Sequence, residues 1–142
     1  MRILIKNAIN VEEHIALLRE GDTSFVNLLG ETNPTILKIV SILKEHFDFV
    51  IKPESYWRIE HTPKGHEWHV DTGTNNHMMW CQVGCSILLT STKEFEGGET
   101  LYNKEEPITV ERDLYDIAAH SSDEWHKVES HAGKRVVLLL FI

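Results

Sequence analysis

The first third of the sequence carries apolar residues at helical spacing. In the stronger of two such stretches they recur at every third or fourth position, at Ile36, Val40, Leu43 and Phe47. This stretch follows Asn33 and Pro34, a capping residue and a proline of the kind that begins helices. A weaker pattern predicts a helix over residues 11–19, capped by Asn10 and ended by Gly21. We therefore expect two helices near the N-terminus, each with one buried face.

Short apolar runs separated by polar turns replace this pattern from residue 49 onward. Together with a run near the N-terminus they predict strands, over residues 2–5, 49–51, 55–61, 67–71, 85–91, 107–119, 125–129 and 135–142. Glycine and proline mark the turns, including Gly97 and Gly98 in the segment FEGGET. Many short strands behind two helices indicate a mainly β protein. We expect a β-sandwich or jelly-roll barrel with the two N-terminal helices packed on one outer face.

The length of 142 residues favours a single domain. We expect residues 1–54 to provide helical support and residues 55–142 to form the β core. Hydrophobic residues make up 42% of the chain and charged residues 25%, which is ordinary for a globular protein and argues against disorder.

The charge balance bears on the choice of partner. The formal net charge is −8, so the chain as a whole should repel a nucleic-acid backbone, and we expect no nucleic-acid partner. No apolar run approaches the roughly 18 residues that span a bilayer, so we expect no membrane association. Cys81 and Cys85 are expected to be buried, reduced thiols, which suits the cytoplasm. The sequence leaves the oligomeric state open.

The segment HEWHVD carries the clearest candidate chemistry. Side chains alternate along an extended strand, so His69 and Asp71 should share one face while His66 points to the other. His126 lies far along the chain at the start of another predicted strand. Two histidines and one carboxylate form the facial set that holds non-haem Fe(II) with open positions. A structural zinc site would instead favour four closed ligands.

Arg135 opens the last apolar strand, nine residues after His126. An unpaired buried guanidinium is costly, so this side chain needs an anionic partner. Its planar fork suits a carboxylate bound through two parallel hydrogen bonds, which fits a dicarboxylate cosubstrate. The alternative is an ion pair with an acidic residue of the protein at the rim.

Taken together, these motifs resemble the Fe(II)- and 2-oxoglutarate-dependent dioxygenases, and specifically their prolyl 4-hydroxylase-like branch. The resemblance covers roughly residues 55–142 and implies a double-stranded β-helix. It implies that iron is held by His69, Asp71 and His126, with O2 as a further cosubstrate and ascorbate as a supporting reductant. It also implies that Arg135 binds the distal carboxylate of 2-oxoglutarate and that FEGGET leads Thr100 to the same pocket.

The sequence departs from the branch at three positions. The tyrosine that members often carry on the strand after the H-x-D segment is missing from CSILLTS, where Ser86 or Thr90 could supply a hydroxyl instead. Ile59 and Glu60 stand where members have a tyrosine before the first ligand. Val137 replaces the serine or threonine found two residues after the arginine.

The resemblance implies hydroxylation of an unactivated C–H bond, with release of succinate and CO2. FEGGET favours a prolyl or other peptidyl substrate. The same chemistry on a free amino acid or small metabolite is one alternative, and a non-catalytic β-barrel binding module is another. The sequence does not identify the substrate, because loops around residues 59–66 and 72–80 should set its identity.

Overall fold

A computed structural model of the protein describes residues 1–18, 24–72 and 77–142. Its helices are α1 (Val11–Leu18) and α2 (Pro34–Lys44), with one 3₁₀ turn, η1 (Thr92–Glu94). The strands, in chain order, are β1 (Arg2–Ile5), β2 (Val26–Asn27), β3 (Tyr56–Glu60), β4 (His66–His69), β5 (Val83–Leu88), β6 (Phe95–Gly97), β7 (Thr100–Tyr102), β8 (Ile108–Thr109), β9 (Ile117–Ser121), β10 (His126–Val128), β11 (His131–Gly133) and β12 (Val137–Phe141).

Both helices begin at the asparagines that the sequence predicts. The side-chain oxygen of Asn33 accepts hydrogen bonds from the backbone N–H groups of Thr35 and Ile36. The side chain of Asn10 accepts from the N–H of Glu13, whose carboxylate accepts in turn from the N–H of Asn10. Such reciprocal bonds satisfy N–H groups that lack partners within the helix. The predicted helix end at Arg19 and Gly21 lies outside the described residues.

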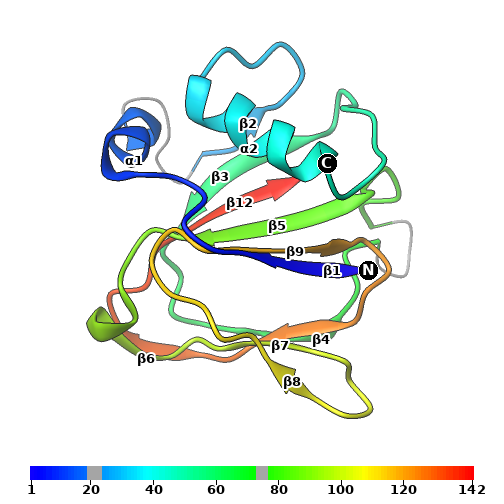
Figure 1. Cartoon of the computed structure of the whole chain (residues 1–142). Helices are drawn as coiled ribbons and strands as arrows, with labels where there is room; N and C mark the ends of the chain where they lie inside the picture. The colour runs from blue at the N-terminus through cyan, green and yellow to red at the C-terminus, as the bar shows by residue number, and fades with distance from the viewer. Residues whose placement is uncertain (19–23, 73–76) are drawn as a thin grey trace.

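The larger layer is a six-stranded antiparallel sheet in the order β1-β9-β5-β12-β3-β2. Figure 1 shows α1 and α2 on one side of this sheet. Alternation along β12 divides its side chains between two faces. Leu138 and Leu140 are fully buried in the same apolar cluster as Ile36, Ile39 and Leu43 of α2. The intervening side chains of β12 therefore face away from the helices.

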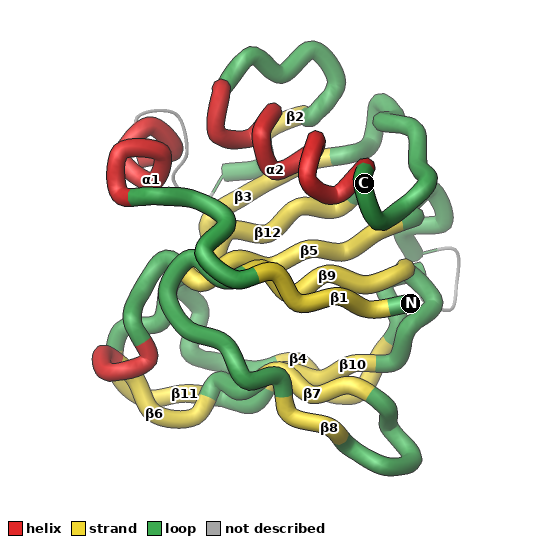
Figure 2. Tube along the Cα trace, viewed as in Figure 1, coloured by secondary structure: helices red, strands yellow, loops and turns green. Residues whose placement is uncertain are grey.

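A smaller layer lies across from the free face of this sheet. It is a four-stranded antiparallel sheet in the order β4-β10-β7-β8, continued by the β6–β11 pair. Figure 2 shows the two layers facing each other, with loops joining them at the ends. The protein is thus mainly β, with two helices and several antiparallel sheets. Neither helix has the length and apolar character needed to cross a bilayer within the described ranges.

Two local predictions were wrong. Residues 49–51 form no strand, because the backbone N–H and C=O of Val50 bond to the side-chain amide of Gln82 rather than to a neighbouring strand. Residues 107–119 do not form one strand, because β8 ends at Thr109 and β9 begins at Ile117. Residues 131–133 form a strand that the sequence did not predict, β11, which pairs with β6. FEGGET contains β6 and the first residue of β7, with Gly97 at the end of β6 and the following Gly98 both at positive φ.

Candidate metal centre

A cavity of about 600 Å³ lies between the two sheets. A volume of this size is ordinary for small-molecule sites in proteins. Its walls combine apolar residues of β12 with ionisable and hydroxyl side chains. Its polar lining residues include His69, Ser86, Thr100, His120, His126 and Arg135.

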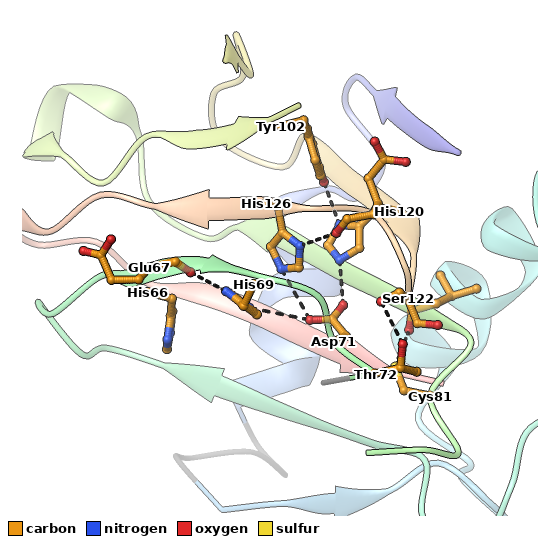
Figure 3. Close-up of polar contacts among 12 residues, drawn as sticks. His66, Glu67, His69, Asp71, Thr72, Cys81, Tyr102, His120, Ser122 and His126 are labelled. Carbon is orange, nitrogen blue, oxygen red and sulfur yellow. Dashed lines mark hydrogen bonds and ion pairs between the residues drawn. The ribbon is translucent and has the colours of Figure 1, made fainter. Parts of the chain in front are cut away.

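The structure brings His69, Asp71 and His126 together. His126 begins β10 and pairs in register with His69 at the end of β4, which places the two imidazoles side by side. The chain then turns, and the backbone N–H of Asp71 bonds to the carbonyl of Ser122 at 3.0 Å. One oxygen of Asp71 lies 3.3 Å from Nε2 of His126 and 3.8 Å from Nε2 of His69 (Figure 3). The three ligand atoms lie within 4.8 Å of one another, close enough to hold one metal ion.

Backbone carbonyls hold the rings of both histidines. Nδ1 of His69 lies 2.6 Å from the carbonyl of Glu67, and Nδ1 of His126 lies 2.9 Å from the carbonyl of Glu124. A carbonyl only accepts, so each Nδ1 carries the proton that it donates. In the neutral imidazoles this leaves the lone pair on Nε2, the atom that faces Asp71.

The electrostatics of the three groups suit cation binding. Burial alone would raise the pKa of Asp71, but hydrogen bonds from His120 and His126 lower it well below its ordinary range, so the carboxylate is charged. Burial lowers the pKa of His69, which favours its neutral, metal-binding form. The pKa of His126 is raised: burial opposes the rise, but the hydrogen bond to Asp71, the negative charge of that carboxylate and the contacts with Glu124 together outweigh it. A bound cation would replace the proton on this imidazole.

His66 lies on the cavity side with His69, and the prediction that it faces the opposite way was wrong. The rings of the two histidines lie 5.9 Å apart, and both line the cavity. The reason is an irregularity in the pairing of β4 with β10. His69 pairs with His126 but His66 pairs with Val128, so four residues of β4 lie opposite three of β10. The extra residue of this β-bulge reverses the alternation of side chains. Among the described residues, His66 is not a member of the candidate metal cluster.

Arg135 lies in the same cavity and is only 6% exposed. Its Nε atom has no hydrogen-bond partner in the described part of the chain. The acid that most affects it is Glu60, but this carboxylate bonds to Arg58 at 2.5 Å. Gly98 makes room for the side chain, since a Cβ there would lie 2.5 Å from Cδ of Arg135. The ion pair at the rim, the alternative expected from the sequence, is not formed among the described residues.

The predicted hydroxyl residues separate into two groups. Ser86 and Thr100 line the cavity, whereas Thr90 does not, and its hydroxyl accepts a hydrogen bond from the N–H of Val136 at 3.1 Å. Sequence reasoning missed Arg112, which donates to the carbonyl of Ser86 at 2.8 Å and to the hydroxyl of Thr100 at 3.2 Å. Burial, together with the positive charge of Arg135, lowers the pKa of Arg112 to about 10.

His120 also belongs to this site, although its sequence position left a surface role and a role behind the metal ligands equally open. It is buried on β9 with Nε2 2.7 Å from Oδ2 of Asp71. Its Nδ1 lies 2.7 Å from the hydroxyl of Tyr102. The signal available in the sequence was a histidine that directly follows the apolar run Ile117–Ala119.

Comparison with known proteins identifies the fold. No protein-family model matches the chain, and no characterised protein matches it by sequence. Among the solved structures that are similar, three cover 99% of this chain. A prolyl 4-hydroxylase from Phytophthora capsici has a TM-score of 0.65 at 19% identity. A 2OG-Fe(II) oxygenase from Burkholderia pseudomallei has a TM-score of 0.64 at 16% identity. A prolyl hydroxylase from Trichoplax adhaerens, in complex with a peptide fragment, has a TM-score of 0.65 at 10% identity.

These matches cover different shares of the other proteins. The chain spans 57% of the Phytophthora protein, 82% of the Burkholderia protein and 83% of the Trichoplax protein. The low sequence identities limit the conclusion to architecture. The chain has the jelly-roll fold of 2OG-Fe(II) oxygenases and prolyl hydroxylases, with a candidate metal cluster of two histidines and one aspartate in its cavity.

Proposed function

We propose that this protein is an Fe(II)- and 2-oxoglutarate-dependent dioxygenase that hydroxylates an unactivated C–H bond. One observation carries the proposal: three metal-ligand side chains and a buried guanidinium without an anionic partner line or adjoin one cavity. A bound cation would complement the metal-ligand side chains, and a bound carboxylate would complement the guanidinium. The proposal includes a double-stranded β-helix core with the two helices as its outer support, acting in the cytoplasm.

In this proposal His69, Asp71 and His126 hold Fe(II). Two neutral imidazoles and one carboxylate match the ligand types that this ion takes in open sites. When bound, the metal would catalyse the oxidation of 2-oxoglutarate and of the substrate C–H bond by O2, giving succinate, CO2 and a hydroxylated product. The protein contributes the ligand geometry, a cavity that limits access by water, and orientation of the two substrates.

Arg135 would bind the distal carboxylate of 2-oxoglutarate, because its donors have no competing acid among the described residues. Thr100 would donate to the same carboxylate. Its hydroxyl oxygen already accepts from Arg112, so its own proton remains available for a second partner. Ser86 lies on the cavity wall and could contact the cosubstrate. Thr90 remains a candidate from sequence alone, with its oxygen engaged by Val136.

A prolyl or other peptidyl residue is the substrate we favour. Tyr56 and Phe141 line the cavity with ring centroids 5.4 Å apart, so they offer flat apolar surface to a ring or aliphatic side chain. The Trichoplax hydroxylase of the same fold binds a peptide fragment. Part of the loop at 72–80, expected to shape the substrate site, lies outside the described residues.

A turnover assay tests the proposal. The purified protein would be incubated with Fe(II), 2-oxoglutarate and ascorbate against proline-containing peptides, free amino acids and other small metabolites. Succinate formation and a mass gain of one oxygen atom on a peptide are expected. Oxidation of free amino acids alone would transfer the function to small metabolites. Absence of both products with every substrate would favour a non-catalytic binding module.

Asp71→Ala is the matched loss-of-function variant. It removes the only carboxylate of the metal cluster and should lower succinate formation by more than about 100-fold, the upper end of the loss caused by removing an outer partner of a ligand. Asp123→Ala, at an exposed position in the turn three residues after His120, should leave turnover unchanged. Undiminished turnover by Asp71→Ala would overturn the metal assignment.

A further inference from the structure

The two carboxylate oxygens of Asp71 have different surroundings. Oδ2 lies 2.7 Å from Nε2 of His120. Oδ1 faces the two other candidate ligands, 3.3 Å from Nε2 of His126 and 3.8 Å from Nε2 of His69. Figure 3 shows His120 on the side of the carboxylate away from His69. One oxygen is therefore engaged by the protein, while the other faces the place where a metal would bind.

His120 is itself held from its other side. Its Nδ1 lies 2.7 Å from the hydroxyl of Tyr102. The three hydrogen-bonded residues are all buried, with exposed fractions of 3% for Tyr102, 7% for His120 and 4% for Asp71. A carboxylate only accepts, so Nε2 donates to Asp71. A neutral imidazole then accepts the hydroxyl proton of Tyr102 at Nδ1. The hydrogen-bond chain thus fixes both the tautomer and the orientation of the ring.

The neighbouring strand leaves space for this pair. Gly84 of β5 is the in-register partner of His120 on β9. A Cβ at Gly84 would overlap Oδ2 of Asp71 and would lie 2.6 Å from Nε2 of His120. Only glycine allows the carboxylate and the imidazole to lie this close to the backbone of the sheet.

We propose that His120, oriented by Tyr102, is a positioning residue that fixes Asp71 as a single-oxygen metal ligand. This inference rests on the proposed metal site. The hydrogen bond to Oδ2 prevents the carboxylate from turning both oxygens toward the cation. The coordination position that a second oxygen would fill remains open for cosubstrate. Outer hydrogen-bond partners of this kind commonly change metal affinity by about 10–100-fold when removed.

Three variants separate the components of the chain. His120→Leu removes the donor to Asp71, Tyr102→Phe removes the partner of His120, and His120→Gln keeps an N–H group near the position of Nε2. Binding of Co(II) by each metal-free protein would be followed by calorimetry and by visible absorption, which depends on the coordination of this ion. Circular dichroism and thermal unfolding would establish that each variant folds.

The chain offers a matched control pair far from the cavity. Nδ1 of His14 lies 2.9 Å from the hydroxyl of Tyr115, and their rings meet edge to face as those of His120 and Tyr102 do. His14→Leu and Tyr115→Phe remove the same chemical groups without touching the metal cluster. Both should bind Co(II) as the wild type does.

His120→Leu is expected to weaken Co(II) binding by about 10–100-fold and to change its absorption spectrum. His120→Gln should restore most of the affinity and the spectrum, and Tyr102→Phe should cause a smaller loss in the same direction. If His120→Leu does not fold, Tyr102→Phe decides. Wild-type affinity and spectrum in folded His120→Leu, or in Tyr102→Phe where the Leu variant does not fold, would overturn the positioning role alone. Failure of the wild type to bind Co(II) would overturn the proposed metal site as well.

Discussion

The two facing sheets differ in regularity, and the difference separates stability from chemistry. In the six-stranded sheet, β12 and β9 each pair with β5 through five successive residues without a shift. In the four-stranded sheet, β10 pairs with β4 through two pairs separated by a bulge. The regular sheet holds the apolar core against the helices, whereas the short, irregular sheet supplies both histidines of the metal cluster. Substitutions in the two regions should therefore have different consequences.

The largest effect on stability should come from the helix-facing side of β12. Leu138→Ala is expected to lower the free energy of unfolding by about 2–5 kcal/mol, because Leu138 is fully buried in the core cluster. Leu139 is the matched control, since it is only partly buried and lines the cavity. Leu139→Ala should cost less stability. Denaturant unfolding measures both, and equal losses would contradict the division of β12 into two faces.

The next effect concerns Arg135. Arg135→Met should weaken 2-oxoglutarate binding by about 30-fold or more, because the distal carboxylate would lose its charged partner. The free energy of unfolding should stay equal or rise, since an unpaired buried guanidinium is replaced by an apolar side chain of similar length. Calorimetry and denaturant unfolding test the two parts. Arg58→Met, which removes a cation already bonded to Glu60, is the control. A large loss of stability with unchanged cosubstrate binding would assign Arg135 to the scaffold.

A smaller effect should appear in the pH dependence of metal binding. The pKa of His126 is raised, and its proton must leave before Nε2 can bind a metal. Affinity for Co(II) should therefore fall toward about tenfold per pH unit once the pH drops below this pKa. The stability of the metal-free protein should change in the opposite direction and rise as the pH falls. The attraction between His126 and Asp71 contributes stability below the unfolded pKa of about 6.5 and is lost as the pH rises through the folded pKa.

Calorimetry at several pH values would measure the affinity, and thermal unfolding of the metal-free protein would measure the opposite trend. Repeating the titrations in buffers of different ionisation enthalpy would count the protons released. An affinity that does not change between about pH 8 and pH 6 would contradict the role of His126 as a ligand that loses a proton.

The candidate metal cluster could be predicted because the types and order of its residues along the sequence indicate it. Both helix caps, and the convergence of His69, Asp71 and His126, could be predicted from residue type and order. The orientation of His66 could not, because alternation assumes a regular strand and the bulge in β4 reverses it.

The partners of His120 and Arg112 depend on which strands become neighbours. His120 meets Asp71 across 49 residues of sequence, and Arg112 meets the carbonyl of Ser86 across 26. Neither contact follows from a local pattern. Thr90 was predicted for the cavity together with Ser86, because alternation along a strand puts the two on one face. Instead, its hydroxyl accepts a hydrogen bond from the N–H of Val136, just before β12.

Anaerobic calorimetry of 2-oxoglutarate binding tests the central claim most directly. The cosubstrate would be titrated into the wild-type protein with and without Fe(II). If the metal cluster and Arg135 act as the two ends of one site, binding should be tight with Fe(II), much weaker without it, and weakened by Arg135→Met even when the metal is present. Binding of equal strength with and without Fe(II), or no binding in either case, would contradict the account.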